Sequence, residues 1–255
     1  MTRAMTSAMT GGMTARAAVA ARSGPAGRSR VTVLRSDGPV ALRETPHGVY
    51  VVGAAAGPLG GDDLRLDIDV GPGAQLVLRS AAGALLLPGP HGGTSWMRIH
   101  ARVAAGGRLD FCLPPAVAAA GCDHRLSAVI ELATGATLRW REAIVLGRHG
   151  ESSGHCVTRL DVTLAGLPLY RGEFGVGRPD TDASSAVLGG ARSAGSAVLV
   201  DAARAQPPAA ASDGLVVMPL AGPGTVVSAT APDAAALEHR LDHGEQLAGY
   251  GPPGL

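Results

Sequence analysis

The chain has 255 residues, of which 46% are hydrophobic, and a formal net charge of +1. This length and composition allow a buried core, and the near-neutral charge argues against nucleic acid or an anionic membrane as a partner. The sequence contains no lysine, so all 22 basic residues are arginines. P-loop NTPases and Schiff-base enzymes each need a lysine in the site, so both classes are excluded.

The 3 cysteines of the chain are Cys112, Cys122 and Cys156. An odd number at wide spacing is not typical of a disulfide framework and favours a reducing compartment, so we expect a cytoplasmic protein. No apolar run reaches the ~18–20 residues that a membrane-spanning helix needs. We therefore expect no membrane partner.

The N-terminal residues 1–16 form a four-residue repeat, MTRA-MTSA-MTGG-MTAR, and no acidic residue precedes Arg35. This composition predicts a disordered tail over residues 1–28, followed by a single β domain over residues 29–250. Arginine-rich, acid-poor segments are also typical of transit peptides, so that alternative stays open.

From Arg30 onward the hydrophobic pattern has a period of two. Leu64, Leu66, Ile68 and Val70 alternate with charged residues, which indicates a half-buried strand. Similar segments, separated by glycine-containing turns, cover residues 75–79, 97–103, 109–113, 125–132, 137–146, 157–164, 169–176, 194–200 and 214–220. We predict an all-β fold of many short antiparallel strands, in an elongated sheet or β-helix-like arrangement. The turn at residues 134–135 pairs two of these segments as neighbours.

One helix is clearly indicated near the C-terminus. Asp233 is suited to its N-cap, and Leu237, Leu241 and Leu247 give the helix an apolar side. We therefore expect one or two helices toward the C-terminus.

The segment 150–154, Gly-Glu-Ser-Ser-Gly, fits the G-x-S-x-G pattern of serine hydrolases, with Ser152 as the nucleophile. That nucleophile must stand between a strand and a helix. Residues 157–164 instead alternate as a strand, so the segment is interpreted as a turn between two strands. A serine or metal-dependent hydrolase remains the alternative function.

A metal site is a second possibility, since Cys122, His124, His155 and Cys156 could together provide Cys₂His₂ ligands. However, adjacent residues of a strand point to opposite faces, so His155 and Cys156 cannot both face one ion. The sequence also lacks a C-x-x-C or H-E-x-x-H motif. We expect no permanently bound cofactor.

Three carboxylates differ from the others in their position. Asp62, Glu142 and Glu151 lie beside glycines or at strand ends, where functional residues are common. Such oxygen ligands could bind a divalent cation transiently. Asp67 and Asp69 alternate with apolar residues and are expected on a solvated strand face.

Several motifs, taken in order, resemble the UreD/UreH family of urease accessory proteins. These are Gly-Pro-Leu-Gly-Gly-Asp-Asp-Leu at 57–64 with Val-Gly-Pro-Gly-Ala at 70–74, Gly-Arg-Leu-Asp-Phe-Cys-Leu-Pro-Pro at 107–115, Glu142 with Gly147-Arg148 and Gly150-Glu151, and Met-Pro-Leu at 218–220 with the last helix. The resemblance spans residues 30–247. Asp110 and Cys112 depart from the family pattern, which has Glu and Trp there.

The resemblance implies a non-catalytic urease-maturation chaperone with an elongated all-β fold. Such a protein binds urease apoprotein, UreF and, through UreF, the GTPase UreG, and assists nickel insertion. Transient passage of Ni²⁺ would then use Asp62, Glu142 and Glu151, and the interaction motif would comprise Gly60, Gly61, Gly147, Arg148 and Gly150. A β-sandwich binding module without a metal role is the remaining alternative.

Overall fold

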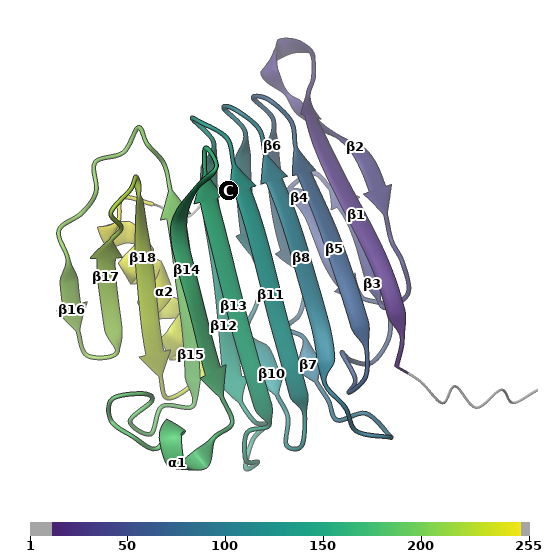
Figure 1. The fold of residues 1–255 in the computed structure, drawn as a ribbon, viewed down its shortest axis with the longest axis vertical. Coiled ribbons are helices and arrows are strands. Elements are labelled where there is room, and N and C mark those ends of the chain that lie inside the picture. The colour runs from purple at the N-terminus through teal and green to yellow at the C-terminus, as the bar shows by residue number, and fades with distance from the viewer. Residues whose placement is uncertain (1–11, 251–255) are drawn as a thin grey trace, which may run out of the picture.

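The structure, a computed structural model, describes residues 12–250. These residues form two stacked sheets (Figure 1). Sheet A has seven strands in the order β14-β13-β11-β8-β5-β1-β2. Sheet B has eleven strands, nine of them in the order β16-β17-β18-β15-β12-β9-β6-β4-β3, while β10 pairs with β12 and β7 pairs with β10. The predicted all-β, β-helix-like fold is therefore confirmed.

The strands of sheet A are β1 (Thr14–Ser23), β2 (Ser29–Arg35), β5 (Asp63–Val70), β8 (Ser95–Val103), β11 (Asp123–Leu132), β13 (His155–Leu164) and β14 (Leu167–Val176). Those of sheet B are β3 (Val40–Thr45), β4 (Gly48–Gly53), β6 (Gln75–Ser80), β7 (Leu85–Leu86), β9 (Arg108–Cys112), β10 (Ala116–Ala118), β12 (Thr137–Leu146), β15 (Ser193–Val200), β16 (Ala210–Ser212), β17 (Leu215–Pro219) and β18 (Gly224–Ala231). The helices are the 3₁₀ turn η1 (Pro25–Gly27), the short α1 (Pro179–Asp182) and α2 (Ala234–Leu247).

The central strands of sheet A are parallel, which corrects the prediction of antiparallel strands. β1, β5, β8, β11 and β13 run in the same direction, each hydrogen-bonded to the next. After each of β5, β8 and β11 the chain crosses to sheet B and then returns, so a strand of the other sheet supplies the crossover that parallel pairing needs. The turn at residues 134–135 thus joins β11 to β12 in the opposite sheet and does not form a hairpin.

The first strand begins inside the segment that was predicted to be a disordered tail. β1 pairs in parallel with β5 from Thr14 opposite Asp63 to Ala21 opposite Val70. Its inward residues are small except for Val19, with Ala15, Ala17 and Ala21 all buried, so they give only a weak hydrophobic pattern. The boundary at residue 28 is therefore too late. Residues 1–11 lie outside the described residues, and their disorder stays a prediction.

The main core lies between the two sheets and is built almost entirely from Val, Leu, Ile and Ala. The largest fully buried side chain is Trp140, which stacks on Phe111 with 3.9 Å between ring centroids and 8° between ring planes. Burying a side chain such as Leu66 or Leu138 stabilises the fold by about 1.5–3 kcal/mol.

Helix α2 packs on the outer face of sheet B, against β15, β17 and β18 (Figure 1). Asp233 caps the helix as predicted, because its Oδ1 accepts a hydrogen bond from the Ala236 amide at 2.8 Å. Leu237 and Leu241 are buried in the second apolar cluster, also as predicted. Leu247 is not, since it is 49% exposed.

Candidate functional site

Glu142 lies in the space between the sheets. Alternation along β12 points Trp140 and Glu142 inward, where Trp140 Nε1 donates a hydrogen bond to Glu142 Oε1 at 2.7 Å. Burial raises the pKa of the Glu142 carboxyl from 4.5 to about 7, although hydrogen bonds from Trp140 and Thr158 act in the opposite direction. The carboxyl therefore changes its protonation state near neutral pH.

Two pockets meet at this residue. One has a volume of about 450 Å³ and the other of about 300 Å³, and Glu142, Ala143, Ile144 and Thr158 line both. The larger extends toward the loops at residues 53–58 and 80–87. The smaller extends between β14 and the strands β15, β17 and β18. Glu142 is the carboxylate that the two linings share.

The cysteine and histidine residues do not form the Cys₂His₂ set considered above. β11 and β13 are paired so that His124 and Cys156 face the core, whereas Asp123 and His155 face outward and bond to each other at 2.9 Å. Burial lowers the pKa of His124 to about 4 and raises that of Cys156, so both groups are neutral at pH 7. Among residues 12–250, no three or more His, Cys, Asp or Glu side chains are grouped to hold a metal ion.

Asp62 holds a loop in place before β5. It is 5% exposed, and its two oxygens accept hydrogen bonds from the Met13 amide at 2.7 Å and the Leu59 amide at 2.9 Å. The neighbouring Gly60 is packed so closely that a Cβ atom there would lie 2.6 Å from the Gly89 nitrogen. Gly61 follows with φ of 94°. This part of the interaction motif is thus a tightly packed loop.

Glu151 closes the turn between β12 and β13. It pairs with the Arg148 guanidinium through two hydrogen bonds of 2.8 and 2.7 Å and also accepts from the Arg148 amide at 3.0 Å. The bonds from Arg148 hold the pKa of Glu151 down at about 2. Gly147 and Gly150 each have φ of 72°, and a Cβ atom at Gly147 would lie 2.6 Å from the Glu151 carbonyl oxygen. The glycines therefore let the turn close around this ion pair.

The predicted turn at residues 150–154 is confirmed, because strand β13 follows it and not a helix. Ser152 is exposed, and the side chain of His155 bonds Asp123 and not Ser152. The scaffold of a hydrolase elbow is absent from this segment. Asp62, Glu142 and Glu151 stand in three separate environments and do not share one ligand set.

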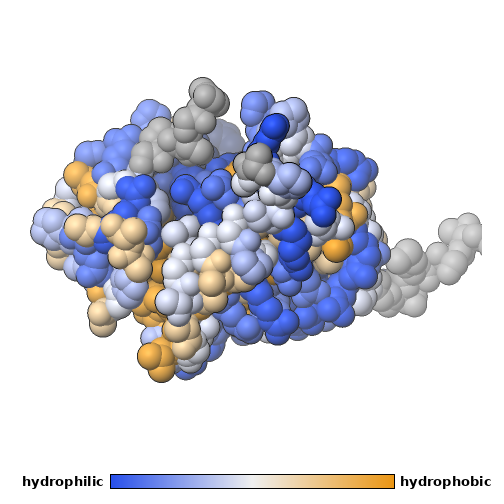
Figure 2. All heavy atoms as spheres, turned by 90° about the horizontal axis from the view of Figure 1, so that it is seen from above, coloured by the Kyte–Doolittle hydropathy of each residue, from blue (hydrophilic) through white to orange (hydrophobic). Residues whose placement is uncertain are grey.

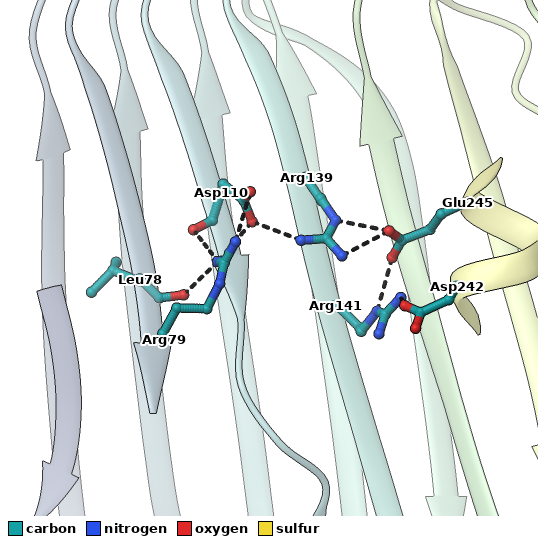
Figure 3. Close-up of polar contacts among 7 residues, drawn as sticks. All are labelled: Leu78, Arg79, Asp110, Arg139, Arg141, Asp242 and Glu245. Carbon is teal, nitrogen blue, oxygen red and sulfur yellow. Dashed lines mark hydrogen bonds and ion pairs between the residues drawn. The ribbon is translucent and has the colours of Figure 1, made fainter. Parts of the chain in front are cut away.

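A buried ion network on the outer face of sheet B was missed by the sequence analysis (Figure 3). Glu245 of α2 is 2% exposed and accepts from Arg139 Nε and Arg141 Nε, each at 2.8 Å. Arg139 also contacts Asp110 Oδ1 at 3.2 Å. Burial opposes the charge of Arg139, but the carboxylates of Glu245 and Asp110 outweigh this effect and raise its pKa. The full series alternates in charge along Arg79, Asp110, Arg139, Glu245, Arg141 and Asp242.

One signal in the sequence could have revealed this network. Glu245 continues the i, i+4 series of Leu237 and Leu241, so it stands on the buried stripe of the helix. A carboxylate in such a position requires a cationic partner. Which strand supplies that partner cannot be inferred from local pattern.

The outer face of sheet A is polar and charge-balanced. Asp67 pairs with Arg16 at 2.7 Å and with Arg65 at 2.9 Å, and Asp69 pairs with Arg22 at 2.7 Å, as expected for a solvated strand face. Figure 2 shows hydrophilic side chains over much of the surface seen from above, with hydrophobic ones in separate groups. Among residues 12–250, no helix is long and apolar enough to cross a membrane.

A family model described as UreD urease accessory protein matches residues 13–249. The chain belongs to the UreD family. The UreD match begins just before β1, which agrees with the place of this strand in the domain. Relatives named urease accessory protein UreD include those of Frankia alni, 41% identical over 89% of this chain and 90% of the relative, and of Parafrankia sp., 43% identical over 89% and 86%. The UreD protein of Streptomyces avermitilis is 37% identical over 91% and 96%. This membership gives the chain a role in urease maturation.

Proposed function

We propose that this protein is a non-catalytic, cytoplasmic chaperone of urease maturation that assists nickel insertion, with Ni²⁺ as transient cargo between the two sheets. The observation that carries the proposal is a carboxyl group, Glu142, at the place where the two pockets meet. The larger pocket is otherwise lined mainly by apolar side chains, and the smaller one also contains Glu173 and several hydroxyl groups, so Glu142 is the carboxylate that a cation would meet from either side.

The chemistry of the Glu142 carboxyl group suits transient binding of a passing cation better than permanent binding. With its pKa raised to about 7, the carboxyl can release a proton as a cation arrives and take one up as the cation leaves. A single oxygen ligand binds a borderline cation weakly, because Ni²⁺ prefers several ligands that include imidazole. The ion is therefore held briefly and then released.

Asp62 and Glu151 have a smaller part in this proposal. The oxygens of Asp62 accept hydrogen bonds from backbone amides, and those of Glu151 accept from Arg148. Each could still offer a free lone pair to a passing cation, but their main effect is to shape the loops on which they lie. The loop residues Gly60, Gly61, Gly147, Arg148 and Gly150 then present these loops to a partner.

The partners in this proposal are urease apoprotein, UreF and, through UreF, the GTPase UreG. Nucleotide hydrolysis must come from such a partner, because this chain has no lysine for a P-loop. A pull-down with each purified partner tests this part, and failure to retain either urease apoprotein or UreF would contradict it.

The nickel role is tested by Glu142→Gln, which preserves the shape of the side chain but removes its charge. The variant is co-expressed with urease subunits, the other accessory proteins and nickel, and the nickel content of purified urease is measured. We expect much less nickel than with the unaltered chain. The matched control is Glu131→Gln on the outer face of sheet A, where the side chain is 48% exposed, and it should load urease normally. Normal loading with Glu142→Gln would overturn the proposal.

A further inference from the structure

Two histidines lie one turn apart on the exposed face of α2. His239 and His243 are at positions i and i+4, so their Cβ atoms are about 5–6 Å apart on the same side of the helix. Both are exposed, whereas Leu237 and Leu241 are buried against sheet B. The two imidazoles therefore point away from the protein and can turn toward a common point in solvent.

The helix that carries them is held firmly. Asp233 caps its first turn, and Glu245 anchors its last turn to Arg139 and Arg141 of β12. A pair of ligands on a fixed backbone loses less conformational entropy on binding than a pair on a loop.

The electrostatic surroundings favour a cation. His243 lies just before the last turn of the helix, whose exposed carbonyl groups carry partial negative charge. Glu238 is exposed beside the pair, whereas the carboxylate of the neighbouring Asp242 is bonded to Arg141. The nearest basic residue along the helix, Arg240, is directed elsewhere, since its guanidinium donates to the Thr230 carbonyl and pairs with Asp213.

We propose that His239 and His243 form a surface site for a borderline divalent transition-metal cation, represented by Ni²⁺. Imidazole suits Ni²⁺, Cu²⁺ and Zn²⁺, and paired histidines at i and i+4 are the spacing by which helical metal motifs bind through one face. Two protein ligands leave the other positions to water, so the cation exchanges readily. This site is separate from Glu142 and does not depend on the proposed function.

The other histidines provide controls. In the described residues His100 pairs with Glu131, His155 pairs with Asp123 and His124 is buried beside Ser95, while His47, His91 and His149 are exposed. None of these lies one helical turn from another histidine. The double variant His47→Gln with His149→Gln thus removes the same number of exposed imidazoles without touching the pair on α2.

The test is calorimetric titration of the full-length, untagged protein with NiCl₂ at pH 7.5, with MgCl₂ as a second titrant. We expect saturable Ni²⁺ binding that Mg²⁺ does not reproduce, because Mg²⁺ prefers oxygen ligands. The His239→Gln/His243→Gln double variant should bind one Ni²⁺ fewer per chain, and the control double variant should match the unaltered protein. Each single variant at the site should bind at least roughly tenfold more weakly, because even outer-shell changes at metal sites cost 10–100-fold.

Two results would overturn the proposal. One is the absence of saturable Ni²⁺ binding by the unaltered protein. The other is unchanged Ni²⁺ stoichiometry and affinity in the His239→Gln/His243→Gln variant, with its circular dichroism spectrum confirming that α2 is folded. Because no urease component is present in this titration, neither result bears on the proposed role in maturation, which the co-expression experiment tests separately.

Discussion

Replacing Glu245 with alanine should destabilise the protein strongly. Glu245 is the central carboxylate of the buried ion network, and its side chain is 3% exposed. The arginines that it contacts, Arg139 and Arg141, have side chains that are each 8% exposed. Removal of the carboxylate leaves two buried guanidinium groups without their shared partner.

The expected loss can be worked from the remaining contacts. Breaking a buried ion pair by removing one partner costs about 3–5 kcal/mol of unfolding free energy. Arg139 keeps Asp110 at 3.2 Å and Arg141 keeps Asp242 at 2.5 Å, which places Glu245→Ala near the lower end, at about 3 kcal/mol. The matched control is Asp242→Ala, since Asp242 bonds the same Arg141 from a position where its side chain is 56% exposed. It should cost about 0–1 kcal/mol.

Urea unfolding followed by circular dichroism measures both variants against the unaltered protein. Coincident transitions at two wavelengths establish whether a two-state free energy applies. For a chain of this size, a loss of about 3 kcal/mol corresponds to a fall in Tm of roughly 6–12 °C. If Glu245→Ala costs no more than Asp242→Ala, the network does not anchor α2 and the reasoning fails.

Three other predictions follow from the site. Glu142 has a folded-state pKa of about 7 against 4.5 when unfolded, so its ionisation destabilises the native state increasingly between these two pH values and fully above the higher one. Glu142→Gln should therefore raise the unfolding free energy by up to about 3 kcal/mol at pH 8 but hardly at pH 4, and an equal change at both pH values in urea titrations would contradict this. Gly60→Ala places a Cβ atom 2.6 Å from a backbone nitrogen, whereas Gly150→Ala meets nothing within 4 Å and only strains a positive φ. The first should lower Tm more than the second, with losses of about 2–3 and 1–2 kcal/mol, and the reverse order would refute the packing argument. Ser152→Ala should leave urease activation unchanged, and loss of activation in a co-expression assay would reopen the hydrolase alternative.

Local patterns were sufficient to predict most strands and the start of α2. The alternation in residues 64–70 reflects one buried face of β5, and Asp233 satisfies an amide of the first helical turn regardless of the rest of the fold. The same alternation, applied to β12, places Glu142 on the face of Trp140. Whether that face lies in the core or at the surface depends on how the second sheet packs against it, and the alternation along one strand carries no information about that packing.

The route of the chain between the sheets could not be predicted in this way. The turn at residues 134–135 is as compatible with a hairpin as with a crossover, because both need a tight glycine turn. The parallel pairing of β11 with β8 and β13 requires the chain to leave sheet A after β11, so the turn leads to a crossover. The ion network has the same origin, since Glu245 and Arg139 are 106 residues apart in the chain.

The nickel content of urease in the absence of this chain is the most direct test of its proposed role. Urease subunits and the other accessory proteins are co-expressed with nickel, either with or without the chain, and urease is purified for metal analysis and activity measurement. We expect urease made without the chain to be deficient in nickel and activity, and restoration of the chain to recover both. Fully nickel-loaded, active urease in its absence would contradict the proposed function.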